Sequence, residues 1–194
     1  MPETIRDGKG RGYLAQVNSD NQLVTRAATN AQRLISTIDG QYYEATTGQI
    51  TLTDAAEKPF IYIKNEITDG KVIVIDRVFW DIWTSTGGSG GDGILEYYRN
   101  PTITGGTDIV PHNTNFRNTG GAEGTFKKNL TTMTGTHWWY GYITDKTSVA
   151  LEEGRIVIPS GSSFGITVEA PTGNTSMVVA INVAFYYLNT SLVQ

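Results

Sequence analysis

The chain has 194 residues and a formal net charge of −4, with no cysteine and two histidines. These counts exclude a disulfide framework and a thiol nucleophile, and they disfavour a histidine-rich metal site. The negative charge argues against nucleic acid as the main partner, and no apolar run approaches the ~20 residues of a membrane-spanning helix. The start of the chain shows no apolar targeting stretch, so we expect synthesis in the cytoplasm and no membrane partner.

The first 28 residues are polar and glycine-rich, without a sustained helical or strand period. Five Lys or Arg residues against three acidic residues give residues 1–33 a net charge of +2, which leaves −6 for the rest of the chain. Such a composition cannot bury enough apolar surface to fold alone, so we expect an extended arm that docks onto a partner. The predicted apolar anchors are Ile5, Tyr13, Leu14, Val17, Leu23 and Val24, and the predicted basic contacts are Arg6, Lys9, Arg11 and Arg26.

The chain beyond the arm divides into a linker and a body. Residues 29–48 are expected to form a short helix and a linker, because the Asp-Gly pair at 39–40 ends a run at the spacing of one helix face: Ala31, Leu34, Ile35 and Ile38. From residue 49 onward, short strand-like runs alternate with turn residues, the pattern of a sandwich or barrel. We predict an all-β fold, an antiparallel jelly-roll β-sandwich over residues 49–194 with an extended N-terminal arm.

Turn residues mark several connections in this body. Asp69-Gly70 predicts a hairpin between the strand-like runs on either side of it. The glycine loop 87–93 and the stretch 170–175, which contains Pro, Gly and Asn, predict two more hairpins. Residues 100–135 are rich in Thr, Asn and Gly. We expect them to form a long loop with a functional or interface role.

The run 71–83 is apolar on both faces, which predicts a strand buried on two sides. Simple alternation assigns two sets to opposite faces: Val72, Val74, Val78, Trp80 and Ile82 on one, and Ile73, Ile75, Phe79 and Trp83 on the other.

The run 177–187 has the clearest period of two in the chain. Its odd positions are large and apolar, and its even positions are mostly smaller or more polar, as in a strand with one face in the core. We therefore predict a central strand with four almost fully buried side chains, Val179, Ile181, Val183 and Phe185.

Acidic residues offer only weak candidates for catalysis or metal binding. Glu152-Glu153 resembles the carboxylate pair of a glycoside hydrolase, but we favour a solvated turn before Gly154. The three aspartates that might gather a calcium ion, Asp81, Asp92 and Asp108, lack the spacing of a calcium-binding loop.

The remaining catalytic motifs are also weak. The glycine loop 87–93 leads into a strand and lacks the lysine of a phosphate-binding loop. His112 and His137 have no orienting acid in view, so no catalytic triad can be assembled. We expect neither catalysis nor a cofactor.

Three consecutive aromatic residues, Trp138, Trp139 and Tyr140, stand out late in the chain. On a strand, the first and third share one face while the second takes the other. One face is expected in the core, and the other forms either a subunit interface or a platform on which a sugar stacks. Several strands are apolar on both faces, which favours association with other subunits.

An ordered set of short motifs resembles tailed-bacteriophage virion proteins. The arm motif DGKGRGYLAQVNSDNQL at residues 7–23 comes first. It is followed by GQITLT at 48–53, YIKN at 62–65, VPHNTN at 110–115 and IPSGSS at 158–163.

The resemblance implies a jelly-roll structural protein of the phage particle, most like capsid decoration (cement) proteins. Its expected partners are the major capsid protein or another virion protein, together with its own copies in a homotrimer. Its expected location is the capsid surface of the virion, after synthesis in the host cytoplasm. A head-fibre, neck or tail-associated protein and a carbohydrate- or receptor-binding module remain as alternatives.

Overall fold

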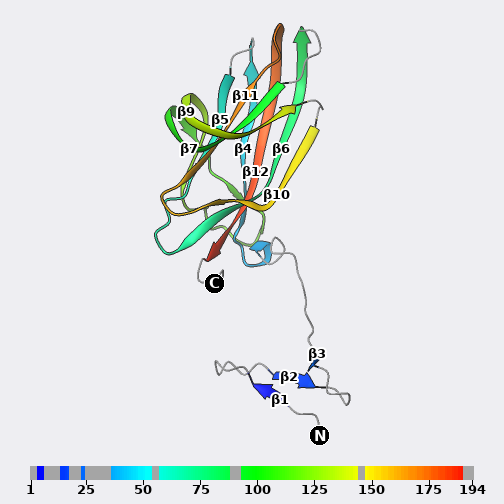
Figure 1. Cartoon of the computed structure of the whole chain (residues 1–194), viewed down its shortest axis with the longest axis vertical. Coiled ribbons are helices and arrows are strands. Elements are labelled where there is room, and N and C mark those ends of the chain that lie inside the picture. The colour runs from blue at the N-terminus through cyan, green and yellow to red at the C-terminus, as the bar shows by residue number, and fades with distance from the viewer. Residues whose placement is uncertain are drawn as a thin grey trace. The chain divides into compact units, whose positions relative to one another are not determined.

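The computed structural model describes residues 4–6, 14–17, 23–24, 36–53, 57–87, 93–143 and 147–189. The chain divides into two compact units, residues 1–31 and 32–194 (Figure 1). No helix in the described part of the chain is long and apolar enough to cross a membrane.

The first unit contains a small antiparallel sheet. Its strands are β1 (Thr4–Arg6), β2 (Leu14–Val17) and β3 (Leu23–Val24), in the order β1-β2-β3. The polar, glycine-rich sequence indicates none of these strands, because each is too short to show an alternating pattern. The segment expected to be a plain extended arm therefore contains paired strands of its own.

The second unit is a sandwich of two antiparallel sheets, which confirms the predicted all-β sandwich. The first sheet has the order β10-β6-β12-β4-β8. Its strands are β4 (Tyr42–Leu52), β6 (Lys71–Gly87), β8 (His112–Asn113), β10 (Thr147–Ile158) and β12 (Asn174–Asn189). Strand β4 begins at Tyr42, inside the range expected to be a linker, and it follows one helical turn at 36–38.

The second sheet comprises β5 (Glu57–Lys64), β7 (Gly93–Asp108), β9 (Thr125–Ile143) and β11 (Ser163–Glu169). It closes on itself, because β9 pairs with β7 along most of its length and with β5 at its start. The neighbours β4-β12-β6-β10 in one sheet and β5-β11-β7-β9 in the other give the topology of a jelly roll. The main hydrophobic core contains side chains from both sheets.

Strand β12 is the middle strand of the five-stranded sheet, as predicted. Val179, Ile181, Val183 and Phe185 have no exposed surface. Asn182, on the opposite face, is half-buried. The predicted register and core face of β12 are therefore confirmed.

The three predicted hairpins are wrong. The turn at Asp69-Gly70 joins β5 to β6, and the loop that begins after Gly87 joins β6 to β7. The predicted turn 170–175 joins β11 to β12, which begins at Asn174. In each case the two strands belong to different sheets. Turn residues favour a reversal of the chain, but they do not determine whether the flanking strands pair or face each other across the core.

A bulge divides strand β6 and corrects the predicted faces. In the pairing with β12, Arg77 lies opposite Ala184 and Ile75 opposite Phe185, so Asp76 has no partner in the ladder. An extra residue reverses the alternation. Val72 and Val74 therefore face away from the main core, whereas the residues that join it are Ile73, Ile75, Val78 and Trp80. The predicted two-sided burial also fails at Trp83, which is 63% exposed.

The outer face of the five-stranded sheet carries a second buried cluster, formed by Tyr42, Val72, Val74, Ala184 and Tyr186. The Tyr42 hydroxyl donates a hydrogen bond of 2.7 Å to Asp76 at the bulge. Burial raises the pKa of Tyr42 well above its ordinary value, and the hydrogen bond to Asp76 adds to this. The hydroxyl therefore remains a donor throughout the neutral pH range.

The segment 100–135, expected to be a long loop, is mostly a two-stranded ribbon. Strand β7 continues to Asp108 and β9 begins at Thr125. A small third cluster joins side chains of β5, β7 and β9 and is formed by Tyr62, Tyr98, Leu130 and Met133. Gly165 makes room for this cluster, because a Cβ atom there would lie 2.5 Å from the Met133 sulfur.

Candidate functional site

The aromatic triplet lies on the part of β9 that pairs with β7 but not with β5. Residues 136–143 of this strand pair with β7, whereas β5 pairs only with residues 125–128. The exposed fractions of Trp138, Trp139 and Tyr140 are 50%, 37% and 61%. The core alternative is therefore excluded for these side chains, and the interface and sugar-platform alternatives both stand.

A bulge sets the direction of Trp138. Tyr97 is opposite Trp139 and Tyr98 is opposite His137, so Trp138 has no partner in the ladder. The buried Tyr97 ring lies behind both tryptophans, with ring centroids 6.0 Å from Trp138 and 4.5 Å from Trp139. The bulge therefore presents Trp138 outward over a fixed aromatic base.

Gly141 is required by the second tryptophan of the triplet. A Cβ atom at this position would lie 2.6 Å from the Trp139 ring. The Trp139 ring therefore packs directly against the backbone of β9, a contact that any larger residue at position 141 would displace.

Trp138 borders a hollow of about 380 Å³. Residues from the end of β10 and the start of β11 form one wall, and residues 98–100 of β7 form another. Two arginines, Arg99 and Arg155, contribute to the lining together with Val157, Phe164 and Ser163. Tyr98 also contributes, while its hydroxyl donates to Glu57 at 2.8 Å. Burial, and then this hydrogen bond, raises the pKa of Tyr98 above its ordinary value.

Asn100 fixes one side of the hollow. It adopts a left-handed backbone with φ of 48°, a conformation that asparagine tolerates better than most residues. Its side-chain oxygen accepts a hydrogen bond of 2.8 Å from the Ser163 backbone N–H. Asn100 thereby ties the middle of β7 to the start of β11.

We expect Asn100→Ala to lower the free energy of unfolding by about 1–2 kcal/mol, because alanine tolerates the left-handed backbone poorly and loses the hydrogen bond. Asn100→Gly restores the backbone freedom but not the hydrogen bond, so its loss should be smaller. Urea unfolding of both variants measures the difference. Equal stability of Asn100→Ala and the wild type would contradict the assigned backbone conformation.

A second structured region surrounds the start of β4. Three asparagines of residues 109–124 donate side-chain hydrogen bonds to backbone carbonyl groups just before β4. Asn113 and Asn118 bind the Gly40 carbonyl at 2.8 and 3.1 Å, and Asn115 binds the Ile38 carbonyl at 3.0 Å. Two of these asparagines fall in the VPHNTN motif, but the sequence alone does not identify their partners.

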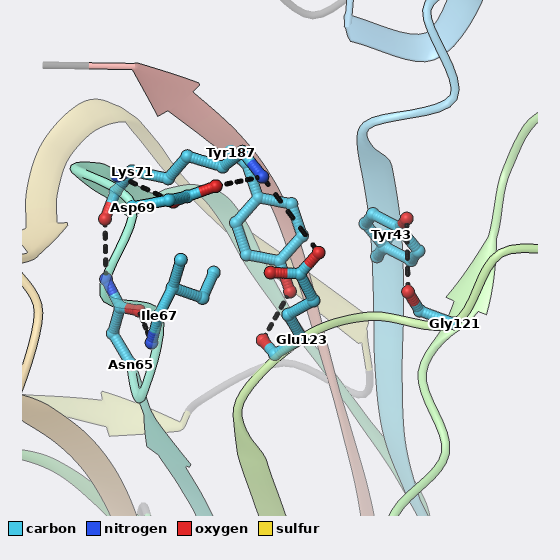
Figure 2. Close-up of polar contacts among 8 residues, drawn as sticks. All are labelled: Tyr43, Asn65, Ile67, Asp69, Lys71, Gly121, Glu123 and Tyr187. Atoms are coloured by element: carbon cyan, nitrogen blue, oxygen red, sulfur yellow. Dashed lines mark hydrogen bonds and ion pairs between the residues drawn. The ribbon is translucent and has the colours of Figure 1, made fainter.

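The same loop is tied to the five-stranded sheet (Figure 2). The Tyr187 hydroxyl donates to the Glu123 carbonyl at 2.6 Å, and Lys71 forms an ion pair with the Glu123 carboxylate at 3.9 Å. The loop exposes Phe116 almost completely, at 99%, and Val110 at 77%. Residues 38–40, directly before β4, are therefore held by an anchored loop that exposes apolar residues on its surface.

The predicted arm residues lie partly on the small sheet of the first unit. Ile5 and Arg6 belong to β1, Leu14 and Val17 to β2, and Leu23 and Val24 to β3. The other predicted contacts, Lys9, Arg11, Tyr13 and Arg26, lie outside the described residues. Their docking role stays a prediction.

The remaining acidic and histidine candidates do not converge. Glu152-Glu153 was expected in a turn, but it lies within β10, where pairing with β6 is interrupted between Leu151 and Ile156. Asp81 and Asp108 lie on strands of different sheets, while Asp92 falls outside the described residues. His112 lies on β8 and His137 on β9. Among the described residues, no group of three or more His, Asp or Glu could hold a metal ion.

Comparison with known proteins gives little further guidance. No family model matches the chain, and no curated protein matches it. Among solved structures, a chain from the T=1 particles of infectious bursal virus has 14% sequence identity and a TM-score of 0.21. The match covers 75% of this chain but 39% of the viral chain. A likeness this weak does not establish a shared fold.

Proposed function

We propose that the protein is a structural, non-catalytic component of a tailed-phage particle that decorates the capsid and binds neighbouring capsid subunits. Its partners are then the major capsid protein, or another virion protein, and its own copies, rather than nucleic acid or a membrane. The proposal draws on the ordered motifs that resemble phage virion proteins. The structural observation that supports it most is the division of the chain into two compact units, residues 1–31 and 32–194.

A separate N-terminal unit is suited to anchoring. The chain divides into two compact units after residue 31, and the described core of the second unit is built from residues 43–187. Ordering a short polar segment costs about 1–2 kcal/mol per residue, which a docking surface must offset. The net charge of +2 on residues 1–33, against −6 elsewhere, suits attraction to an acidic surface on a neighbouring subunit.

The loop 109–124 defines where such an anchor leaves the body. Its asparagines bind the carbonyl groups of Ile38 and Gly40, a few residues after the N-terminal unit ends.

Deletion of residues 1–28 should leave a folded body that no longer binds particles. We expect cooperative thermal unfolding close to that of the full chain, and loss of co-sedimentation with expanded capsids. A matched control replaces the apolar anchors Ile5, Leu14 and Leu23 with Asp at unchanged length, and it should lose binding as the deletion does. Undiminished binding of the deleted protein would exclude the arm as the anchor, and failure to fold would place the arm in the core.

We further propose a homotrimer, which suits a threefold position on an icosahedral shell. Exposed aromatics on both sheets support association, since Trp83 lies on β6 and Tyr142 on β9, each 63% exposed. Multi-angle light scattering across the micromolar range should give three times the mass of the 21.2 kDa chain. A monomer mass in solution, and a monomer again on the particle, would contradict this proposal.

A further inference from the structure

The hollow beside Trp138 combines an aromatic surface with two guanidinium groups. We propose that it binds a carboxylated sugar, such as a uronic acid residue of a surface polysaccharide. This binding activity is additional to the proposed structural role and does not use the arm.

The aromatic part of the site is shaped by the bulge in β9. Trp138 stands outside the ladder, half exposed, with the buried Tyr97 ring behind it. Such an outward indole offers an apolar face on which the C–H side of a sugar ring stacks. The hollow of about 380 Å³ lies within the range of small-ligand sites.

The charge of the lining selects an acidic ligand. Among the described residues that line the hollow, two are arginines and none is Asp or Glu, although acidic residues outnumber basic ones in the chain. Arg99 comes from β7 and Arg155 from β10, so they approach the hollow from different sheets. A guanidinium group forms paired, charge-assisted hydrogen bonds with a carboxylate, an arrangement that a neutral sugar cannot use.

The polar groups of the lining suit the hydroxyls of the same ligand. Ser162 and Ser163 lie beside Asn100, whose side-chain oxygen accepts the Ser163 N–H. Hydroxyl and amide groups can both donate and accept hydrogen bonds. Because Asn100 is fixed by this hydrogen bond, part of the polar wall is ordered before a ligand arrives, which reduces the entropic cost of binding.

The test uses the full-length protein and three soluble probes: glucuronate, glucose and glucose 6-phosphate. Saturation-transfer NMR titrations should show glucuronate binding at least about tenfold tighter than glucose, from the added charge-assisted contacts. Tighter binding of glucose 6-phosphate than of glucuronate would overturn the carboxylate assignment. The absence of any glucuronate signal, or equal binding of glucuronate and glucose, would overturn the site itself.

Matched variants locate the site. Trp138→Ala and Arg99→Gln should each weaken glucuronate binding at least about tenfold, while Trp83→Ala and Arg117→Gln, exposed residues outside the lining, should not. Equal losses in the control variants, or none in the lining variants, would overturn the proposal. Capsid binding by Trp138→Ala should match that of the wild type, so failure of the sugar site and failure of the structural role give different results.

Discussion

Replacement of Phe185 by alanine should lower the free energy of unfolding by about 3–5 kcal/mol, because it removes a fully buried aromatic ring from the middle of the core. Phe185 lies on the central strand β12 and stacks on Tyr43 at 5.7 Å and on Phe126 at 5.1 Å. Phe126 belongs to β9 in the other sheet, so the ring joins the two layers of the sandwich. Such a loss is a large part of the stability of an ordinary domain.

Urea unfolding followed by tryptophan fluorescence measures this effect. Phe116→Ala is the matched control, because Phe116 is 99% exposed and a surface substitution of this kind changes stability by no more than about 0.5 kcal/mol. Similar midpoints for the two variants would mean that the core face of β12 is assigned incorrectly.

The second large effect is expected at Asn65, whose side chain is fully buried. Its amide nitrogen donates to the Lys71 carbonyl at 3.1 Å and its oxygen accepts the Ile67 N–H at 3.0 Å (Figure 2). The same amide nitrogen donates to the Ile158 carbonyl at 2.9 Å. The Asn65 backbone also bonds to the turn after β10, because the Gly161 N–H donates to its carbonyl at 2.8 Å. Asn65 therefore holds together two turns that cross between the sheets.

Asn65→Ala should lower the free energy of unfolding by on the order of 1–3 kcal/mol for each buried backbone group left without a partner. The total loss should then be comparable to that of Phe185→Ala. Asn65→Asp tests the cause, since a carboxylate keeps the acceptor for Ile67 but loses both donors and places a charge in the core. It should be at least as destabilising as alanine. Thermal unfolding measures the effect. Free energies of unfolding of both variants within about 1 kcal/mol of the wild-type value would contradict this role for Asn65.

Alternation along a strand was sufficient to predict β12 and the sandwich, because a period of two depends only on which side faces the core. It could not show which strands pair. The turns at Asp69-Gly70 and 170–175 connect opposite sheets, and the same turn residues serve a hairpin equally well. In the described part of the chain, β7 and β9 do pair with each other, but their connected ends lie in the Thr-, Asn- and Gly-rich segment 100–135, where large apolar residues are few and alternation is weak.

The candidate site was predicted only in its aromatic part. Trp138 and Trp139 are conspicuous in the sequence, but whether they are exposed depends on the bulge in β9. Arg99 and Arg155 are distant in the sequence and lie on strands of different sheets, so only the jelly-roll topology brings them to one hollow. A local pattern carries no signal for a site assembled in this way.

The measurement that tests the proposed function most directly is electron microscopy of the phage particle with this protein labelled. We expect the label at regular positions over the capsid shell, at a fixed high copy number, and absent from particles made with the arm-deleted protein. A label confined to a single vertex, the neck or the tail, or the absence of label from the particle, would contradict the proposed decoration of the capsid.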